Sequence, residues 1–278
     1  IIRKLSSAES LGATTIICSD KTGTLTKGEM TVRKVYCDGK ITEVTGVGYE
    51  PTGEFHQSTS PVDPRNDSDL SLLLKIGTLC NNARLDNVNG TWSIFGDPTE
   101  GALIVTAAKA GFEQKELERQ YPRKNEIPFT SERKRMTTVH LTSEAEQVAY
   151  MKGAPEIVLE RCAYILRNGE IKKLSSKDKN EVLRVNEKLA SDALRMLGMA
   201  YKKLPNDATF DEEKIERDLV FVGLEGMIDP PREESVKANQ LCQQAGIKAV
   251  MITGDHKLTA MAVAKEIGIL KENSIVLT

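Results

Sequence analysis

The amino-acid sequence predicts an α/β protein in which a parallel sheet is interrupted by a long inserted domain. Residues 13–18 are apolar and β-branched, which is the composition of a parallel strand that is covered on both faces. Residues 248–253 form a second predicted strand. The region between them contains helix and strand patterns of its own. The simplest organisation is therefore one discontinuous sheet domain that carries an insertion.

The sheet domain is expected to comprise residues 1–35 and 220–278, and the insertion residues 36–219. The second segment of the sheet domain has four predicted elements: a strand at 220–224, a helix at 233–245, the strand at 248–253 and a final helix at 256–267. We expect the strands of both segments to pair in one sheet.

The inserted domain has a mixed α+β pattern. Its predicted strands are residues 91–95, 137–141 and 147–151. Its predicted helices are residues 69–81 and 99–110, together with one long or broken helix at 176–202.

Composition limits the classes of function. The 278 residues are 40% hydrophobic and 28% charged, which is enough for two cores, and the net charge of -2 offers no basic field for nucleic acid. No segment approaches the ~20 consecutive apolar residues that a membrane helix needs, so we expect the chain by itself to be soluble. The five cysteines are odd in number and widely spaced, as expected for reduced thiols.

The segment Cys18-Ser19-Asp20-Lys21-Thr22-Gly23-Thr24-Leu25-Thr26 points to chemistry at an aspartate. Asp20 follows a predicted strand, and open α/β sheets bind ligands at the carboxyl ends of their strands. Gly23 permits a tight bend that lets backbone amides and threonine hydroxyls converge on a phosphate. The alternative for Asp20 in isolation is a helix or turn cap.

Thr22 indicates the fate of a phosphorylated Asp20. Phosphatases of the haloacid dehalogenase superfamily carry a second aspartate at this place, which serves as acid and then as base for the hydrolytic water. A threonine cannot relay protons in this way. An aspartyl-phosphate on Asp20 should therefore persist long enough to drive another process.

Six further blocks and one arginine, taken in order, resemble the P-type ATPases, the cation pumps that phosphorylate the aspartate of Asp-Lys-Thr-Gly-Thr. The blocks are residues 9–12, 96–103, 129–136, 151–156, 229–232 and 251–255, and the arginine is Arg195. The resemblance implies a haloacid-dehalogenase-like (Rossmann-like) parallel sheet with an inserted α+β nucleotide-binding domain. The family pattern continues to a Gly-Asp-Gly-x-Asn-Asp segment beyond Thr278, so we expect a C-terminally truncated sheet.

The resemblance also implies roles around the phosphoryl group. Asp20 would attack the γ-phosphorus of ATP, with Mg²⁺ held by its carboxylate and by the Thr22 carbonyl, since Mg²⁺ prefers oxygen ligands. The other residues implied at this centre are Lys21, Thr24, Thr253, Gly254 and Asp255. A Thr-Gly-Asp turn is also common in ordinary strand-to-helix connections, and Asp255 stands where a helix N-cap belongs.

The adenine and polyphosphate of ATP are assigned to the inserted domain by the same resemblance. Phe129 would stack on adenine and Glu100 would face its amino edge. Lys134 and Lys152 would neutralise phosphates, and Gly153 would permit their close approach. The alternatives are a core phenylalanine and a first-turn glutamate favoured by the helix dipole.

Three further residues are assigned to the nucleotide by resemblance. Arg195 would reach the β-phosphate, although a solvated arginine on the predicted long helix is the alternative. Asp229 and Arg232, in the hinge-like Asp-Pro-Pro-Arg, would face the nucleotide; the alternative for them is a surface ion pair.

The implied setting is the cytoplasmic face of a membrane. The cofactors would be ATP and Mg²⁺, and the partners would be the transmembrane and actuator domains of the parent pump. The sequence around Cys18 most resembles calcium pumps, with the transported cation bound elsewhere. The chain alone is expected to bind ATP weakly without sustained turnover.

Two other functions remain open from the sequence. One is a nucleotide-binding interaction module without catalysis. The other is a soluble phosphatase of the haloacid dehalogenase kind, against which Thr22 argues.

Overall fold

The chain divides into two compact units. Unit 1 comprises residues 1–29 and 229–278, and unit 2 comprises residues 30–228. The computed structural model describes residues 12–205, 210–254, 257–271 and 274–277. The divisions after Glu29 and Ile228 differ from the boundaries expected at 35 and 220.

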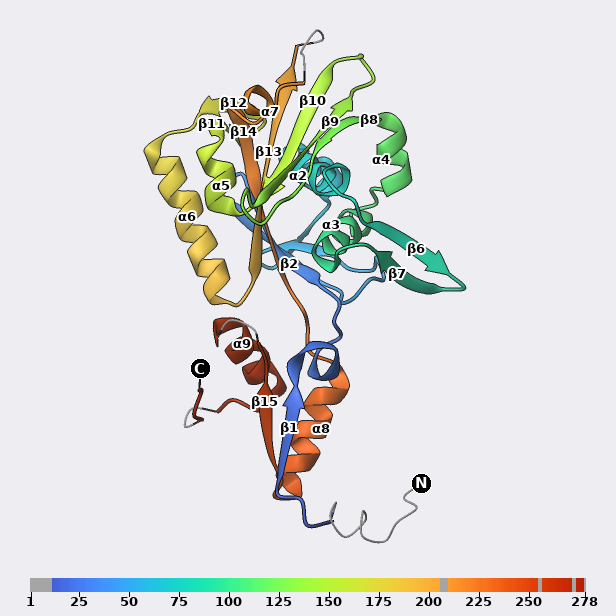
Figure 1. Cartoon of the computed structure of the whole chain (residues 1–278), viewed down its shortest axis with the longest axis vertical. Coiled ribbons are helices and arrows are strands. Elements are labelled where there is room, and N and C mark those ends of the chain that lie inside the picture. Colours follow the sequence, from blue (N-terminus) through green and yellow to red (C-terminus); the bar gives the residue numbers. More distant parts are fainter. Residues whose placement is uncertain (1–11, 206–209, 255–256, 272–273, 278) are drawn as a thin grey trace. The chain divides into compact units, whose positions relative to one another are not determined.

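Unit 1 contains a small parallel sheet, in which β1 is blue and β15 red in Figure 1. Its described elements are β1 (Ile16–Asp20), the turn η1 (Lys21–Leu25), α8 (Glu233–Gln244), β15 (Lys248–Ile252) and α9 (Lys257–Ile267). β1 and β15 run parallel, with Ile16 opposite Lys248 and Asp20 opposite Ile252. The predicted parallel pairing of these two strands is therefore confirmed.

The haloacid-dehalogenase-like sheet is not confirmed, because the described part of unit 1 contains two paired strands only. The prediction that the first strand is covered on both faces is wrong for these residues. Ile16 is 55% exposed and Ile17 is 40% exposed. Among the described residues β1 has one strand neighbour, β15, and the helix α8 packs against β15. This leaves Ile16 and Ile17 of β1 exposed.

The assignment of residues 220–224 to the parallel sheet is also wrong. These residues belong to β14 (Leu219–Ile228), which lies in the middle of the sheet of unit 2. β14 pairs antiparallel with β2 (Thr31–Cys37) and β13 (Arg195–Leu204), and parallel with β11 (Cys162–Arg167). An apolar run of residues is typical of central strands in parallel and antiparallel sheets alike. Only the long-range pairing shows to which sheet residues 220–224 belong.

The main sheet of unit 2 has eleven strands and is mostly antiparallel. The strand order is β5-β4-β3-β2-β14-β13-β10-β9-β8, with β11 and β12 joined through β14. The remaining bounds are β3 Lys40–Val44, β4 Phe55–Gln57, β5 Ser60–Val62, β8 Arg123–Ile127, β9 Arg135–Leu141, β10 Gln147–Gly153 and β12 Glu170–Lys173. A separate hairpin is formed by β6 (Arg84–Val88) and β7 (Thr91–Phe95).

Helices cover both faces of this sheet (Figure 1). The described helices of unit 2 are η2 (Pro64–Asn66), α2 (Ser68–Leu79), α3 (Pro98–Lys109), α4 (Gln114–Gln120), α5 (Pro155–Glu160), α6 (Ser176–Ser191) and α7 (Glu212–Ile215). Leu73 of α2 and Leu103 of α3 share one hydrophobic core, whereas Val158 of α5 and Val182 of α6 share another.

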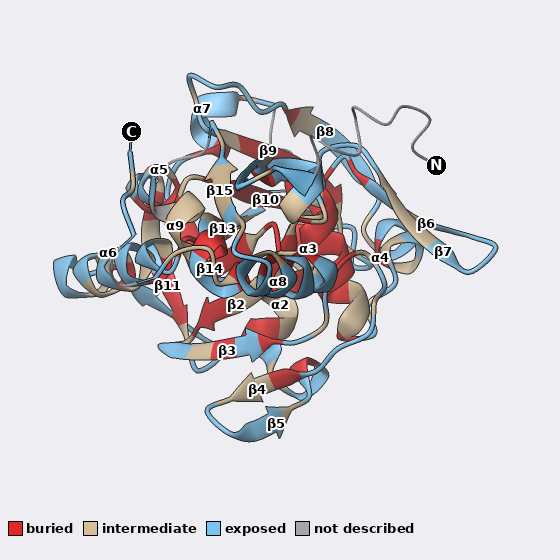
Figure 2. Ribbon diagram, turned by 90° about the horizontal axis from the view of Figure 1, so that it is seen from below, coloured by how far each residue is buried: buried red, intermediate tan, exposed pale blue. Residues whose placement is uncertain are grey.

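Successive side chains of the central strands point to opposite faces of the sheet and so pack into the two cores in turn. In β10, Tyr150 belongs to the core under α2 and α3, and the next residue, Met151, belongs to the core under α5 and α6. In β14, Val220 and Phe221 divide in the same way. Figure 2 shows the resulting concentration of buried residues on the central strands and on α2 and α3.

The predicted helix at 176–202 is wrong beyond Ser191. α6 begins with a capping box in which the Ser175 hydroxyl accepts from the Asp178 N–H at 3.2 Å. After α6 the backbone turns at Ala193, whose φ is 62°, and β13 begins at Arg195. The amphipathic pattern of α6 continues into residues 195–202. These residues form a strand because they pair with β10 and β14.

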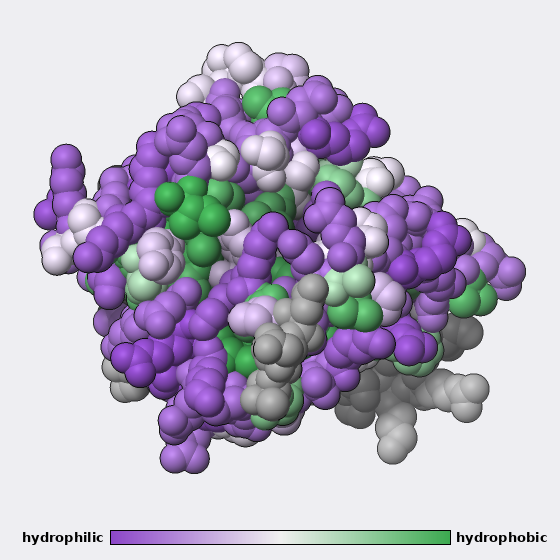
Figure 3. Space-filling model, turned by 90° about the horizontal axis from the view of Figure 1, so that it is seen from above, coloured by the Kyte–Doolittle hydropathy of each residue, from purple (hydrophilic) through white to green (hydrophobic). Residues whose placement is uncertain are grey.

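One face of the molecule can be described by its polarity. The face drawn in Figure 3 is predominantly hydrophilic, with smaller hydrophobic areas between charged regions. Within the described ranges, no helix combines the length and apolarity that crossing a bilayer requires. All five cysteines are free thiols in the structure.

Candidate functional site

Asp20 lies at the carboxyl end of β1, where the chain turns sharply. The carboxylate is exposed, and its Oδ1 accepts a hydrogen bond from the Lys21 N–H at 2.9 Å. Gly23 has a φ of 73°, which favours glycine, and the turn closes when the Thr26 N–H donates to the Lys21 carbonyl at 3.0 Å. Thr22 and Thr24 are exposed on this turn, next to the aspartate.

Asp229 holds the turn from inside unit 1. It is 8% exposed, and its two carboxylate oxygens accept from the Thr26 hydroxyl at 2.6 Å and from the Gly28 N–H at 2.9 Å. The Lys21 ammonium, on a buried side chain, lies 4.0 Å from the same carboxylate. The polar contacts of Asp229 therefore fix the segment that follows Asp20.

Arg232 fixes the same turn through backbone carbonyls. Its guanidinium donates to the Gly23 carbonyl at 3.1 Å and to the Thr26 carbonyl at 3.0 Å. The alternative of a surface ion pair between Asp229 and Arg232 is not what the described residues show. This contact between the hinge-like segment and the turn was missed from sequence, because residues about 200 positions apart carry no local signal of pairing.

Thr253 and Gly254 come directly after β15. Because Asp20 stands opposite Ile252 in the parallel pair, Thr253 begins at the same edge of the sheet as the turn after Asp20. The structure thus brings Asp20, Thr22 and Thr253 to one edge. Asp255, which we expected beside them, lies outside the described residues.

The oxygen donors at this edge suit magnesium. The Asp20 carboxylate and the Thr22 carbonyl are hard ligands, and Mg²⁺ usually combines one or two carboxylates with water and substrate phosphates. Within the described parts of the chain, no group of three or more His, Cys, Asp or Glu could hold a metal ion. The residues present fit a Mg²⁺ that is completed by substrate and water.

A second set of predicted residues gathers at one edge of the sheet in unit 2. The register places Ile127, the end of β8, opposite Thr137 of β9, and Arg135, the start of β9, opposite Gly153 of β10. Gly153 in turn stands opposite Gly198 of β13. The ends of β8, β9 and β10 and the first half of β13 therefore lie at this edge, which we call the nucleotide edge after the ligand that the sequence led us to expect there.

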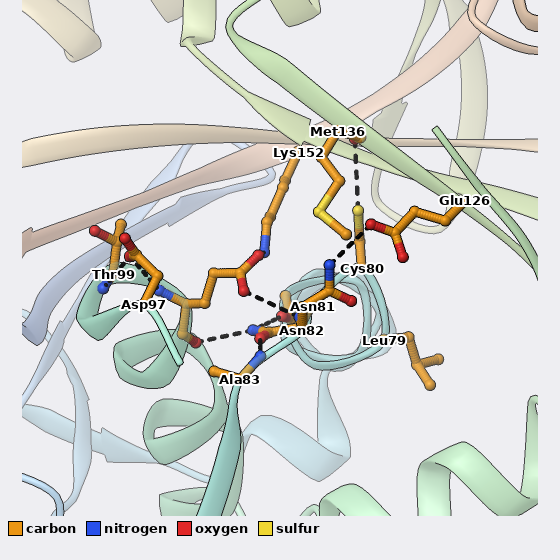
Figure 4. Close-up of polar contacts among 12 residues, drawn as sticks. Leu79, Cys80, Asn81, Asn82, Ala83, Asp97, Thr99, Glu126, Met136 and Lys152 are labelled. Atoms are coloured by element: carbon orange, nitrogen blue, oxygen red, sulfur yellow. Dashed lines mark hydrogen bonds and ion pairs between the residues drawn. The ribbon is translucent and has the colours of Figure 1, made fainter. Parts of the chain in front are cut away.

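Lys152 and Glu100 form an ion pair at the nucleotide edge, across 52 sequence positions. The Lys152 ammonium donates to Glu100 Oε1 at 2.6 Å, and the two side chains are 8% and 18% exposed. Figure 4 shows Lys152 directed toward the first turn of α3, where Asp97 caps the helix by accepting from the Thr99 N–H at 2.7 Å. A buried pair of this kind leaves a costly charge if either partner is removed.

The second Glu100 oxygen is held by residues that the sequence analysis missed. Oε2 accepts from the Asn82 N–H at 3.0 Å, and the Asn81 amide donates to the Glu100 carbonyl at 2.8 Å (Figure 4). Arg123 donates to the side chain of Asn82 at 2.6 Å. The only signal in the sequence was a pair of asparagines at the end of the predicted helix 69–81.

Phe129 and Lys134 lie on the loop between β8 and β9. The Phe129 side chain is 58% exposed, which leaves its ring accessible to a ligand. Lys134 has a φ of 51°, and its carbonyl accepts from the Ala154 N–H at 3.0 Å. A Cβ on Gly153 would stand 2.5 Å from this carbonyl, so the close approach of the two backbones requires glycine.

Arg195 lies on the first residue of β13, not on a helix as expected. Its guanidinium donates to the Thr99 hydroxyl at 3.2 Å, in the first turn of α3. The side chain is exposed. The structure thus brings Arg195 to α3 close to Glu100, the same helix start that Lys152 contacts.

Two cavities among the described residues are not lined by the predicted nucleotide residues. The larger, of 830 Å³, is lined by charged side chains, among them Arg133, Arg135 and Glu216. The smaller, of 260 Å³, includes Phe210 and Ile215. The exposed ring of Phe129 is therefore a better guide to binding than cavity volume.

Comparison with known proteins decides the family. Residues 69–234, more than half of the chain, match the family described as P-type ATPase, cytoplasmic domain N. The chain belongs to the P-type ATPases. The matched range includes Glu100, Phe129, Lys152 and Arg195 of the nucleotide edge.

Relatives named as pumps align with almost the whole chain. A calcium-transporting ATPase of Bacillus subtilis is 41% identical over 273 residues, 98% of this chain and 31% of the relative. A cation-transporting ATPase of Synechocystis is 44% identical over 279 residues, covering 98% and 30%. A calcium-transporting ATPase of Listeria monocytogenes is 39% identical over 279 residues, covering 100% and 30%. This P-type ATPase chain spans less than a third of each relative.

Proposed function

We propose that this chain is the nucleotide-binding and phosphorylation region of a longer P-type cation pump, in which Asp20 accepts the γ-phosphate of ATP. The ordered turn after Asp20 carries the proposal, together with the family membership. The finer assignments follow from it: unit 1 as a phosphorylation domain of the haloacid-dehalogenase-like kind, and unit 2 as the nucleotide-binding domain.

The nucleotide site that we propose is the nucleotide edge of unit 2. The exposed Phe129 ring offers a flat apolar surface for adenine. Lys134, Lys152 and Arg195 supply positive charge, and Glu100 supplies a carboxylate that can accept from an amino group. Each of these polar groups comes from a different element, and strand register and the start of α3 bring them together.

The reaction at Asp20 requires positioning and charge neutralisation more than covalent chemistry. An Asp20 carboxylate oxygen would attack the γ-phosphorus, and ADP would leave with the bridging oxygen. Lys21, Thr22, Thr24 and Thr253 would orient the phosphoryl group, and Gly254 and Asp255 would help to place the nucleotide. Mg²⁺, held by the Asp20 carboxylate and the Thr22 carbonyl, would neutralise phosphate charge.

Asp229 and Arg232 have a supporting place in this proposal. Their hydrogen bonds to the turn at Gly23, Thr26 and Gly28 keep Asp20 on a defined backbone. A nucleotide-facing role remains part of the proposal for both residues.

The transported ion is proposed to be Ca²⁺, and the site of action the cytoplasmic side of a membrane. Two of the relatives reported above are named as calcium-transporting ATPases. The ion itself would be bound by other parts of the pump, and phosphorylation of Asp20 would drive its movement. Transmembrane and actuator domains are the corresponding proposed partners.

Phe129→Ala is expected to weaken ATP binding by the 278-residue chain about tenfold or more, because base-aromatic stacking contributes about 1–3 kcal/mol. Isothermal titration with ATP measures the effect. The matched control is Phe210→Ala, which removes another exposed phenylalanine of unit 2, 44% exposed, and should leave the affinity unchanged. Equal affinities of wild type and Phe129→Ala would show that adenine binds elsewhere.

A further inference from the structure

Glu216 is a buried carboxylate that the sequence analysis did not single out. It follows the short helix α7 and is 2% exposed. Burial by itself raises the pKa of this carboxyl, but hydrogen bonds from Arg133, Thr137 and Arg135 outweigh it, so the net pKa is lowered. Glu216 is therefore an ionised group inside the protein.

Among the described residues, the hydrogen-bond donors to the Glu216 carboxylate come from β9 and the loop before it. Oε1 accepts from the Arg133 guanidinium at 2.5 Å and from the Thr137 hydroxyl at 2.7 Å. Oε2 accepts from the Arg135 guanidinium at 2.8 Å. One carboxylate thus fixes the two arginines on either side of Lys134.

The same arginines tie down the loop that carries Phe129. Arg133 also donates to the Pro128 carbonyl at 2.9 Å, directly before Phe129. Arg135 also donates to the Arg133 carbonyl at 3.2 Å. Within the loop, the Lys134 N–H donates to the Thr130 carbonyl at 2.8 Å. A continuous chain of hydrogen bonds therefore runs from Glu216 to the backbone on both sides of Phe129.

We propose that Glu216 is a positioning residue for ATP binding, which acts by holding the Phe129–Lys134 loop in its binding conformation through Arg133 and Arg135. This proposal rests on the proposed function of the loop as a nucleotide site. Glu216 itself does not touch the nucleotide. The left-handed backbone at Lys134, with a φ of 51°, is a conformation that such external support would maintain.

Glu216→Gln is expected to weaken ATP binding by the 278-residue chain about tenfold, because the amide is neutral and presents an NH₂ group to a guanidinium. Titration with ATP is made at a temperature where circular dichroism shows each variant fully folded. Arg133→Gln is a second variant with a more exposed side chain, 24% exposed, and should weaken binding in the same direction.

The control carboxylate is Glu181 of α6. It accepts from the Tyr36 hydroxyl at 2.7 Å and from Arg167 at 3.0 Å, and its hydrogen bonds to described residues do not reach the Phe129–Lys134 loop. Glu181→Gln should leave ATP affinity within twofold of wild type. A loss of affinity in this variant equal to that of Glu216→Gln would mean that general destabilisation is responsible, and would overturn the proposal.

A double-mutant cycle with Phe129→Ala separates positioning from general damage. If Glu216 acts through the loop, Glu216→Gln should cost about tenfold in wild type and about threefold or less in the Phe129→Ala background. Equal losses in the two backgrounds, or a Glu216→Gln affinity equal to wild type, would overturn the role of Glu216 alone. Absence of ATP binding by wild type would instead overturn the proposed function together with this inference.

Discussion

The Asp20→Asn variant of the full-length pump is expected to form no phosphoenzyme from ATP while it still binds the nucleotide. An amide nitrogen or oxygen in place of the carboxylate removes the anionic nucleophile, and the proposed Mg²⁺ ligand loses its charge. The nucleotide edge, with Phe129 and Lys152, belongs to unit 2 and is unchanged by the substitution. The loss of phosphorylation should be complete.

The measurement uses ATP labelled in the γ-phosphate, an acid quench and counting of the protein-bound label. The matched control is Asp38→Asn, which alters an aspartate of unit 2 whose ion-pair partner is Lys40 at 3.0 Å, and it should retain the label. An Asp20→Asn pump that still becomes labelled would exclude Asp20 as the acceptor.

The same experiment separates the alternative functions. A wild-type pump that binds ATP without any labelling would support an interaction module without catalysis. Rapid cleavage of small phosphate esters, with no label retained, would support a phosphatase. Thr22 argues against the phosphatase, because a threonine two positions after Asp20 cannot supply its acid and base.

Glu225→Gln is expected to stabilise unit 2 at neutral and alkaline pH. Glu225 lies on β14, is 0% exposed, and neither of its carboxylate oxygens has a hydrogen-bond partner among the described residues. Its Oε1 lies 3.0 Å from the point that a Cβ on Gly77 of α2 would occupy, so helix and strand enclose it closely. An ionised carboxylate in such a place is costly.

Burial raises the pKa of Glu225 to about 8, and the positive charge of Lys152 on β10 opposes this only in part. Lys152 is itself paired with Glu100 of α3 at 2.6 Å. Because the folded state holds the proton above the unfolded pKa of 4.5, stability is full below pH 4.5 and falls as pH rises toward 8.

Urea unfolding of wild type and Glu225→Gln between pH 5 and pH 9 measures the effect. We expect the free energy of unfolding of the variant to exceed that of wild type by roughly 3 kcal/mol at pH 7 and to show a smaller decline toward pH 8. The pKa of His140 is lowered to about 4 by burial, so its contribution has the opposite sign and lies below pH 6.5. The interval from pH 6.5 to 8 therefore isolates Glu225.

Glu43→Gln, on the exposed side of β3 in the same sheet, is the control and should keep the wild-type pH dependence. A Glu225→Gln variant that is no more stable than wild type at pH 8 would contradict the assignment of a buried, destabilising carboxylate.

The correct predictions concern elements that depend on local backbone preferences and on helix capping. The β-branched residues before Asp20 predicted a strand, and Gly23 predicted the tight turn, since backbone preference decides both. The starts of α2 and α3 follow from Asp67 and Asp97, whose side chains cap the helices.

The wrong predictions concern segments whose structure depends on long-range strand pairing. Residues 195–202 continue the amphipathic pattern of α6 and become a strand only between β10 and β14. Residues 220–224 are apolar enough for any central strand, and their partners lie in three other strands, β2, β11 and β13. The resemblance to pumps did not resolve either point, because sequence motifs mark ligand contacts and not strand order.

For the candidate site, too, single residues could be assigned from the sequence but their tertiary contacts could not. Glu100 and Lys152 were each assigned to ATP by resemblance, but their mutual ion pair required the structure. Glu216 was missed because it lies in a charged run, residues 211–218, of the kind that usually faces solvent. Glu225 was missed because it is a lone charge directly after the predicted strand 220–224. The burial of a single charged side chain depends on tertiary packing, so a local sequence pattern does not predict it.

The central claim is that Asp20 takes up the γ-phosphate of ATP, and the most direct test is to find the phosphorylated residue. The full-length pump is incubated with Mg²⁺ and labelled ATP, quenched in acid and digested, and the labelled peptides are sequenced by mass spectrometry. The account predicts one labelled peptide, with the phosphate on Asp20 and sensitive to hydroxylamine as an acyl phosphate is. Phosphate on any other residue, or ATP hydrolysis without a covalent intermediate, would contradict it.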